Sequence, residues 1–278
     1  MLVSSKELLQ TARDKKFAVP SANFFDQDSI KTYTEVATKK NLPIILSIAE
    51  SHFQYLSLDE AVVLGKFYGS NTDTPVVLHL DHGVTLDVIK KAVDIGFTSV
   101  MIDASQEPFG VNVKKTEEVV RYAHEKGVVV EAEIGHVGTG SLYEKNNDDS
   151  IYTTVEEAKE FVDQTNVDSL AISIGTAHGA YTGKPKINFQ RLNDIAKSIA
   201  TPLVLHGGSS SGDHNLEKCA LGGITKINIF TDFTVSALNS VRHGNPENYF
   251  EMKELARKGM RECLENYYKV FHTEKFHS

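Results

Sequence analysis

The chain has 278 residues, of which 41% are hydrophobic, and this size and composition suit one large globular core. Its formal net charge is −8, and no run of lysine and arginine is long enough to follow a phosphate backbone, so we expect no nucleic-acid partner. There is no long apolar stretch or basic amphipathic segment, and neither Cys219 nor Cys263 has a second thiol nearby; we therefore expect a cytoplasmic protein with no disulfide framework and no membrane contact.

Eight short runs rich in β-branched residues recur at intervals of roughly thirty residues, the length of one strand-and-helix unit. They span residues 17–23, 43–49, 75–81, 99–104, 128–134, 169–174, 202–206 and 225–229. Near-continuous apolar strands separated by helix-length segments indicate a parallel sheet that helices cover. Eight such units are what a closed barrel requires, so the sequence predicts an α/β fold in which residues 1–278 form a single (β/α)8, or TIM, barrel domain.

The segments between these runs carry helix signals of their own. Leu86–Ile95 places its apolar residues near one face, and residues 115–126 and 154–165 have similar patterns. Residues 248–271 have a longer helical pattern, which predicts either one helix or two helices with a break near Gly259. We expect this tail to form a C-terminal helical extension of the barrel.

The connection after the fifth run, residues 135–153, is too long for a simple turn and contains Gly138 and Gly140. Long loops within compact domains tend to be mobile and functional. We interpret this segment as a flexible loop that acts as a catalytic flap. The alternative is a disordered surface excursion.

Three histidines and one aspartate lie at or just past the downstream ends of the predicted strands. Asp81 and His82 end the third strand, His178 follows the sixth and His206 ends the seventh. In a (β/α)8 barrel the carboxyl ends of all strands meet at one rim, which carries the active site. A catalytic zinc site typically uses three protein ligands and leaves a position for water or substrate. The sequence therefore predicts a catalytic zinc ion on the three histidines, with Asp81 beside it.

The other histidines receive a different interpretation. His79 lies two residues before Asp81 on the same strand, so it shares the side of that carboxylate but lies deeper in the barrel. We interpret it as a packing or hydrogen-bonding residue behind the site. His52 and the remaining histidines lack the strand-end context, and we expect them to have surface or capping roles.

Glycine-rich turns follow two of the site histidines. Gly179 directly follows His178, and Gly207 and Gly208 follow His206 and precede Ser209. Such turns allow backbone amides to approach an anion closely. Together with Asn228 and Thr231, which follow the eighth strand, they match the place where barrels often build a phosphate site, after strands seven and eight.

Six motifs in chain order give the sequence a specific resemblance. They are LHLDHG at 78–83, VMIDAS at 100–105, VEAEIG at 130–135, GTAHG at 175–179, LHGGS at 205–209 and KINIFTD at 226–232. With these motifs the chain resembles the class II, metal-dependent ketose-bisphosphate aldolases of the fructose-bisphosphate and tagatose-bisphosphate aldolase family. The resemblance covers nearly the whole chain.

The resemblance implies a role for each matching residue. It implies one Zn²⁺ per subunit on the three histidines and Asp81 as the catalytic acid or base at the C4 oxygen of the substrate. It implies a second or displaced metal position at Asp103 and Glu133, and a monovalent cation, Na⁺ or K⁺, bound by main-chain carbonyls. The substrate would contact Asn23, Gly179, Gly207, Gly208, Ser209, Asn228 and Thr231.

The implied reaction is the reversible cleavage of a phosphorylated ketose, of the fructose or tagatose 1,6-bisphosphate type, to dihydroxyacetone phosphate and an aldehyde such as glyceraldehyde 3-phosphate. Zinc would act as the Lewis acid, so no Schiff-base lysine is needed and Lys226 is interpreted as a packing residue. A homodimer or homotetramer is expected. The alternatives are a class II aldolase for another ketose or deoxy-ketonate phosphate, a catalytically silent sugar-phosphate binding protein and a zinc hydrolase.

The chain departs from the family pattern in three places. The family flap carries an acidic pair after its glycines, whereas this chain has Tyr143 and Glu144 after Gly138 and Gly140. We assign the proton transfer at C3 to Glu144, with Tyr143, Asp148 and Asp149 as alternatives. Phe24 and Phe25 replace a polar residue after the first strand, and Ser210 replaces a common glycine in the phosphate turn. The part of the substrate distal to the metal is therefore expected to differ.

Overall fold

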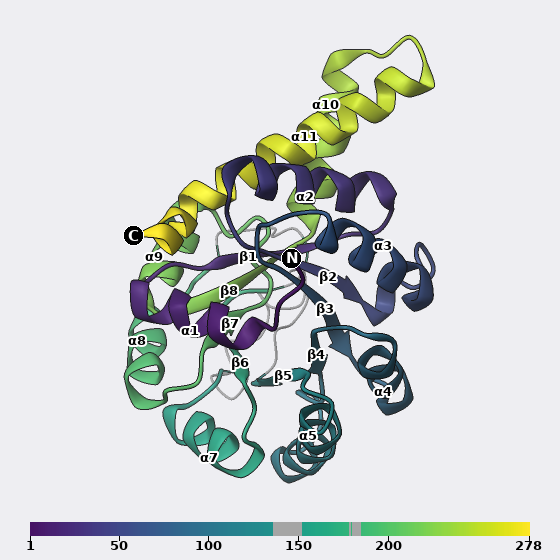
Figure 1. Ribbon diagram of the computed structural model, residues 1–278. Helices are drawn as coiled ribbons and strands as arrows, with labels where there is room; N and C mark the ends of the chain where they lie inside the picture. The colour runs from purple at the N-terminus through teal and green to yellow at the C-terminus, as the bar shows by residue number, and fades with distance from the viewer. Residues whose placement is uncertain (136–151, 178, 180–184) are drawn as a thin grey trace.

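The computed structural model describes residues 1–135, 152–177, 179 and 185–278, and its centre is a closed barrel of eight parallel strands arranged in chain order (Figure 1). β8 pairs with β1 and closes the barrel. The strands are β1 Val19–Asn23, β2 Ile44–Ala49, β3 Val76–Gly83, β4 Ser99–Ile102, β5 Val129–Ile134, β6 Ser169–Ile172, β7 Leu203–Leu205 and β8 Ile224–Ile229. The predicted (β/α)8 barrel is confirmed, and each β-branched run coincides with one strand to within two residues at either end.

Helices surround the barrel and connect successive strands (Figure 1). They are α1 Ser5–Lys15, α2 Gln27–Lys40, α3 Leu58–Ser70, α4 Leu86–Ile95, α5 Phe109–His124, α7 Val155–Thr165, α8 Phe189–Ser198, α9 Asp213–Gly222, α10 Thr231–Gly244 and α11 Tyr249–Val270, with short 3-10 turns η1 Glu50–His52 and η3 Thr273–His277. α4 has the bounds that the sequence predicted. α5 begins earlier than the predicted segment 115–126. None of the helices within the described ranges is long and apolar enough to cross a membrane.

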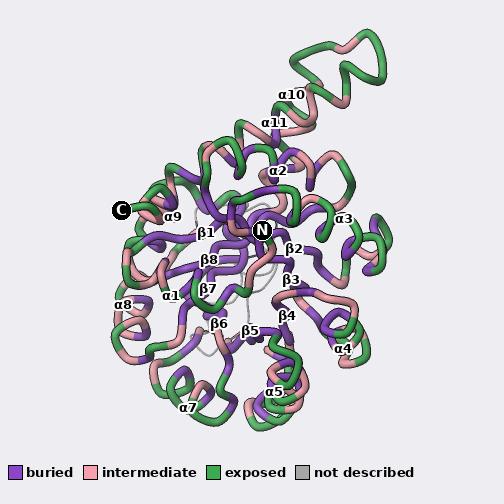
Figure 2. The backbone as a smooth tube through the Cα atoms, viewed as in Figure 1, coloured by how far each residue is buried: buried purple, intermediate pink, exposed green. Residues whose placement is uncertain are grey.

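The apolar core forms a shell between the strands and the helices, where Figure 2 shows buried strands and helices exposed on their outer sides. A second apolar cluster closes the amino end of the barrel, where Leu8 and Leu9 of α1 pack against Val19, Ile45 and Val77 of the first three strands. Above this cluster the barrel interior becomes polar. The apolar packing that stabilises the fold therefore lies outside and below the rim that carries the site.

The last two long helices form a hairpin that projects away from the barrel (Figure 1). α11 runs without interruption through Gly259, so of the two alternatives that the sequence allows, one continuous helix is found and the break near Gly259 is not. A Cβ atom at Gly259 would lie 2.2 Å from the carbonyl oxygen of Ser236 on α10. The glycine therefore allows the two helices to approach closely, and the helix tolerates its low propensity because packing compensates.

We predict that Gly259→Ala destabilises the protein by about 1–3 kcal/mol, because the added methyl group has to push α10 away from α11. Denaturant unfolding of both proteins measures this difference. Gly110→Ala is the matched control, since Gly110 lies in α5 with no atom within 4 Å of an added Cβ. The control should be neutral or stabilising by up to about 1 kcal/mol, and an equal loss in both variants would contradict the close-packing explanation.

Candidate active site

Asp81 and His82 end β3 and both face the centre of the rim, although they are neighbours in one strand. Successive side chains of a regular strand point to opposite faces. Between Leu80 and Gly83, however, β3 advances three residues while β4 advances two, so β3 contains a bulge. The backbone of His82 has a φ of 44°, in the left-handed region that non-glycine residues seldom adopt. The bulge thus turns His82 to the same side as Asp81.

The carboxylate of Asp81 is held from both sides. Asn23 at the end of β1 and Asn228 near the end of β8 each donate a side-chain N–H to one oxygen of Asp81, at 2.8 Å. The residue is only 3% exposed. Burial opposes its ionisation, but nearby positive charge, first that of His82, outweighs burial and holds its pKa well below the usual range. Asp81 is therefore a fixed, ionised carboxylate at neutral pH.

Two imidazoles face one another beside this carboxylate. Nε2 of His82 lies 2.8 Å from Nδ1 of His206, and Nδ1 of His82 hydrogen-bonds Asp103 at 2.7 Å. Burial disfavours a charge on His82, but Asp81 and Asp103 raise its pKa to about 9. Burial and the neighbouring His82 lower the pKa of His206. A protonated His82 therefore donates to a neutral His206.

This arrangement fits a divalent metal ion. The ligand atoms of Asp81, His82 and His206 lie within 4.8 Å of one another. Two imidazole nitrogens and a carboxylate are donors that zinc accepts. Metal binding requires deprotonated ligands. A metal ion bound to Nε2 of His82 and Nδ1 of His206 would therefore displace the proton that these two nitrogens share.

A buried ion pair supports His206 from below. Glu131 of β5 contacts Nζ of Lys226 of β8 at 2.8 and 2.9 Å and accepts a hydrogen bond from Nε2 of His206 at 2.9 Å. Burial opposes ionisation of Glu131, but Lys226 and His206 hold its pKa well below the usual range. Since Nε2 of His206 donates its proton in a hydrogen bond to Glu131, Nδ1 is the nitrogen that His206 presents to the rim.

His79 belongs to the same buried network, as the sequence predicted. Its Nδ1 hydrogen-bonds Ser99 at 2.8 Å, and its Nε2 lies 3.4 Å from Nζ of Lys226. Burial and the charge of Lys226 lower the pKa of His79 to about 3, so the ring stays neutral. Lys226 is 1% exposed and engaged with Glu131, which agrees with its interpretation as a packing residue.

A second cluster of possible metal ligands shares His82 with the first. The ligand atoms of His82, Asp103 and Glu133 lie within 4.8 Å of one another. Asp103 is occupied by hydrogen bonds from His82 and from the hydroxyl and backbone of Ser105. The two residues predicted for a second metal position, Asp103 and Glu133, are therefore brought to the rim beside the histidines.

The turn after β7 meets the start of α10, as the phosphate-site hypothesis requires. The backbone N–H of Gly208 donates to the carbonyl of Asn228, and the hydroxyl of Ser209 accepts from the backbone N–H groups of Phe230 and Asp232. Thr231 is the first residue of α10. A helix N-terminus and a glycine turn meet here, which is a suitable place for an anion.

Gly207 and Ser210 both adopt left-handed backbone conformations in this turn. Gly207 has a φ of 66°, and an added Cβ would lie 2.5 Å from the carbonyl oxygen of Ala177, so the position requires glycine. Ser210, which departs from the family pattern, has a φ of 61°. Both its backbone N–H and its hydroxyl bond to Asp232, which also accepts a hydrogen bond from Tyr267. These bonds compensate the strain that a glycine would avoid.

Two predicted site residues lie outside the described residues. They are His178, the third expected zinc ligand, and Glu144, which belongs to the predicted flap. Gly179 is described and has a φ of 86°, which fits a tight turn. Among the described residues, the structure brings together Asp81, His82 and His206 with Asn23, Asn228, Asp103 and Glu133 at one rim.

Sequence reasoning missed two residues near the rim. Glu131 lies in the VEAEIG motif, but a glutamate inside an apolar strand gives no indication of its partner across the barrel. The sequence predicts a surface or capping role for His52, yet burial lowers its pKa while the charges of Asp81 and His82 also act on it. Its position in η1, three residues beyond β2, is the signal that could have found it.

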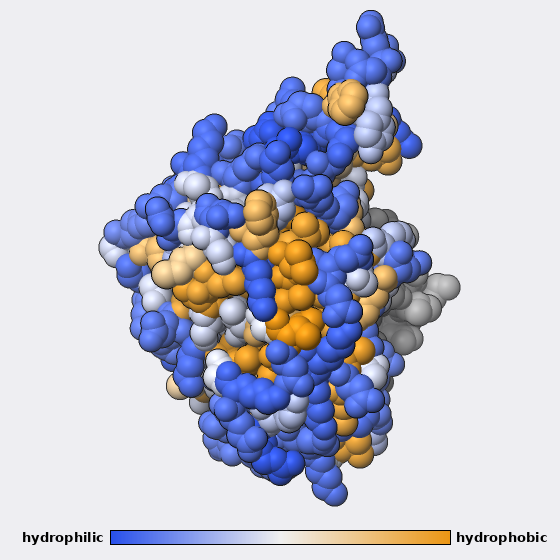
Figure 3. Space-filling view, turned by 45° about the vertical axis from the view of Figure 1, so that its right-hand side comes forward, coloured by the Kyte–Doolittle hydropathy of each residue, from blue (hydrophilic) through white to orange (hydrophobic). Residues whose placement is uncertain are grey.

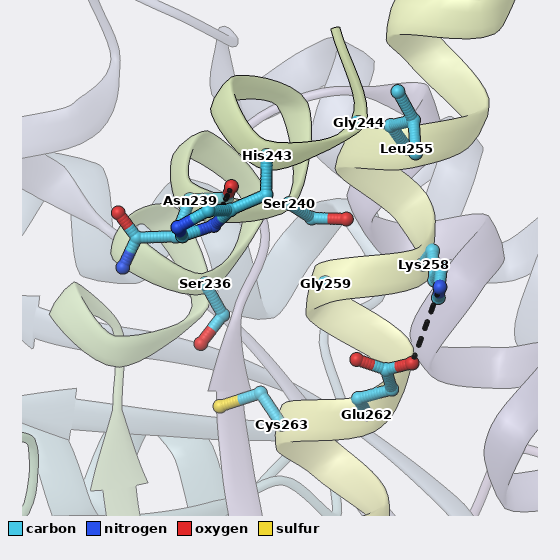
Figure 4. Close-up of a pocket in the computed structure, with 10 residues that line it drawn as sticks. All are labelled: Ser236, Asn239, Ser240, His243, Gly244, Leu255, Lys258, Gly259, Glu262 and Cys263. Atoms are coloured by element: carbon cyan, nitrogen blue, oxygen red, sulfur yellow. Dashed lines mark hydrogen bonds and ion pairs between the residues drawn. The ribbon is translucent and has the colours of Figure 1, made fainter.

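A groove of about 470 Å³ lies elsewhere, between α10 and α11. In Figure 4 the side chain of Cys263 on α11 points toward Ser236 on α10, and Lys258 pairs with Glu262 along α11. The lining of the groove contains no residue of the rim, so it is separate from the candidate active site.

Comparison with known proteins agrees with this geometry. The family model "Fructose-bisphosphate aldolase class-II" matches residues 3–275. A fructose-bisphosphate aldolase of Staphylococcus aureus is 39% identical, and one of Staphylococcus epidermidis is 37% identical, each over 98% of both chains. Among solved structures, the YdjI aldolase of Escherichia coli K12 has a TM-score of 0.88 at 29% identity and covers 98% of both chains.

The fold and the rim together define a (β/α)8-barrel protein with a site suited to a divalent metal and a fixed carboxylate beside it. The chain belongs to the class II fructose-bisphosphate aldolase family. The resemblance that the six motifs indicated is thereby confirmed.

We predict that Lys226→Met destabilises the protein by about 3–5 kcal/mol, because it leaves the charge of Glu131 buried without its positively charged partner. Adding Glu131→Gln should recover part of this loss, since no isolated buried charge remains. Denaturant unfolding at neutral pH measures both variants. Lys91→Met removes the exposed pair with Asp59 and should cost less than about 1 kcal/mol; an equal effect at the two sites would refute the role given to burial.

Proposed function

We propose that the protein is a metal-dependent aldolase that reversibly cleaves a phosphorylated ketose to dihydroxyacetone phosphate and an aldehyde. The substrate is of the fructose or tagatose 1,6-bisphosphate type, and the aldehyde is of the glyceraldehyde 3-phosphate type. One observation carries the proposal: in a class II aldolase chain, an ionised Asp81 lies beside the two imidazole nitrogens that face each other at the rim.

The family is zinc-dependent in general, and we propose one Zn²⁺ per subunit on His82, His206 and His178. His82 and His206 supply facing nitrogens, and His178 is the third ligand that the sequence predicts. When bound, the ion supplies a Lewis acid that polarises the ketone and stabilises the negative charge left by carbon–carbon cleavage. Asp103 and Glu133 offer a second metal position, and a monovalent cation, Na⁺ or K⁺, completes the proposed cofactor set.

Asp81 is the proposed base. During cleavage it takes the proton of the C4 hydroxyl, and during condensation it returns the proton to the same oxygen. Its low pKa keeps it ionised, and Asn23 and Asn228 hold its two oxygens in place. Proton transfer by a positioned group typically contributes about 10²- to 10⁴-fold to the rate. The C3 proton transfer remains assigned to Glu144.

The dihydroxyacetone phosphate half is proposed to bind at the turn after β7. Gly207, Gly208 and Ser209 would approach its phosphate together with Thr231 at the start of α10. Gly179, in the connection after β6, is proposed to contact the same half of the substrate. The side-chain oxygen Oδ1 of Asn228 is buried and has no hydrogen-bond partner among the residues that the structure describes, so it can accept a substrate hydroxyl.

A cleavage assay on the zinc-loaded protein, with fructose 1,6-bisphosphate, tagatose 1,6-bisphosphate and ketonate phosphates and coupled detection of triose phosphate, tests this function. Asp81→Ala should retain zinc, measured as metal content, while cleavage falls by about 10²- to 10⁴-fold because the base is lost. His206→Ala should lose zinc and activity together. Normal cleavage by Asp81→Ala, or cleavage that persists after verified removal of zinc, would contradict the mechanism.

We also propose that the protein is a homodimer or homotetramer and that the α10–α11 hairpin contributes to the contact. Figure 3 shows apolar residues among hydrophilic ones on this projection. Phe250 is 81% exposed and Tyr249 62% exposed, and Val235 and Leu238 of α10 are also exposed. Apolar side chains at the end of an arm have no core to pack against in their own chain, and a second copy is the simplest partner that covers them.

Phe250→Ser is expected to shift the protein toward smaller assemblies, because it removes the most exposed of these aromatic side chains. Sedimentation velocity over a range of protein concentrations measures the shift. Phe67→Ser is the matched control, since Phe67 is similarly exposed on α3 of the barrel. Dissociation by the control alone, or by neither variant, would place the contact elsewhere or leave the chain monomeric.

A further inference from the structure

His52 lies directly above the end of β3. It is the last residue of η1, which follows β2, and Ala49 at the end of β2 pairs with Asp81. Glu50 of the same turn accepts hydrogen bonds from the backbone N–H groups of Val84 and Thr85 at 2.8 and 3.1 Å, and from the hydroxyl of Thr85. These bonds fix the turn to the residues that follow His82.

The imidazole of His52 belongs to a small aromatic wall. The centroid of the His52 ring lies 4.3 Å from that of Phe230. Phe25 contacts the ring of Phe230 edge-on, with 5.9 Å between the two centroids. Phe25 comes two residues after Asn23, and Phe230 two residues after Asn228, the two residues that hold Asp81. The three rings therefore follow the ends of β1, β2 and β8, the strands whose ends surround the proposed base Asp81.

Nδ1 of His52 is closed off from solvent, and no residue within the described ranges hydrogen-bonds to it. Buried polar groups are paired in the great majority of cases, so an unpaired one in a functional site requires an explanation. Burial lowers the pKa of His52, and the charge of Asp81 only partly offsets this. The neutral ring offers one N–H donor and one acceptor, the combination that a hydroxyl group matches.

We propose that His52 is a specificity-determining residue that hydrogen-bonds a hydroxyl group of the aldehyde half of the substrate through Nδ1, with Phe25 and Phe230 bordering that half. This inference rests on the proposed aldolase function. The proposed base acts on the C4 oxygen, which comes from the aldehyde, and His52 lies beside that base. The turns proposed for the phosphate of the other half follow β7 and β8, whereas His52 follows β2.

The test compares two aldehydes in condensation with dihydroxyacetone phosphate: glyceraldehyde 3-phosphate and 3-oxopropyl phosphate, which lacks the hydroxyl next to the carbonyl. A site that hydrogen-bonds a hydroxyl discriminates against an analogue without it. The wild type should prefer the hydroxylated aldehyde in kcat/KM. In His52→Phe, which keeps the ring against Phe230 but removes the nitrogen, this preference should fall by about tenfold or more, the effect of one lost hydrogen bond.

A conservative variant and a remote one serve as controls. His52→Asn places an amide near the position of Nδ1 and should retain most of the preference. His124 is the last residue of α5 and pairs with Asp168, away from the rim. His124→Gln should therefore not alter the preference for the hydroxylated aldehyde. The proton on the hydroxymethyl carbon of dihydroxyacetone phosphate, the carbon that becomes C3 of the ketose, can exchange with deuterated water without any aldehyde. The rate of this exchange is the internal reference for each variant.

The outcomes separate the two proposals. An unchanged preference in His52→Phe, with normal proton exchange, overturns the role of His52 and leaves the aldolase proposal intact. A zinc-loaded wild type that neither exchanges the C3 proton nor condenses either aldehyde overturns the aldolase function and the inference with it. A fall in proton exchange equal to the fall in condensation would show that His52 acts on the site as a whole and not on the aldehyde.

Discussion

The ion pair between Lys226 and Glu131 is the interaction on which the site depends. Two opposite charges lie inside the barrel, almost wholly removed from solvent. Removing charges from water is expensive, and the cost is recovered only when every hydrogen-bonding position is occupied. Glu131 forms the ion pair with Lys226 and also accepts a hydrogen bond from Nε2 of His206, so its oxygens are occupied. The same glutamate thus balances the charge of Lys226 in the core and orients His206, a proposed metal ligand.

The same arrangement explains where stability and function lie in the molecule. Barrel interiors are usually filled by layers of branched apolar residues, but here only the layer at the amino end is apolar, where α1 closes the barrel. The next layer contains His79, Glu131 and Lys226, and hydroxyls such as Ser99 and Ser169 complete its hydrogen bonds. Apolar packing outside the barrel carries the fold, which leaves the interior available for polar groups.

The fold could be predicted from the sequence because hydrophobic periodicity reports burial directly. The eight strands and the shared rim follow from it, and so does the gathering of Asp81 and His206. The side on which His82 lies does not follow, because alternation alone would send it away from its neighbour Asp81, and only the bulge reverses this. The roles of Glu131 and His52 depend on contacts with residues far away in the chain, which no local pattern contains.

The bulge in β3 also bears on how such a site can arise or be transplanted. A strand without the extra residue can present Asp81 or His82 to the interior, but not both, so adjacent base and ligand cannot be obtained by substituting side chains alone. An insertion of one residue, and the left-handed backbone that accompanies it, has to come first. A designer who copies the site onto another barrel must therefore begin by changing the length of a strand.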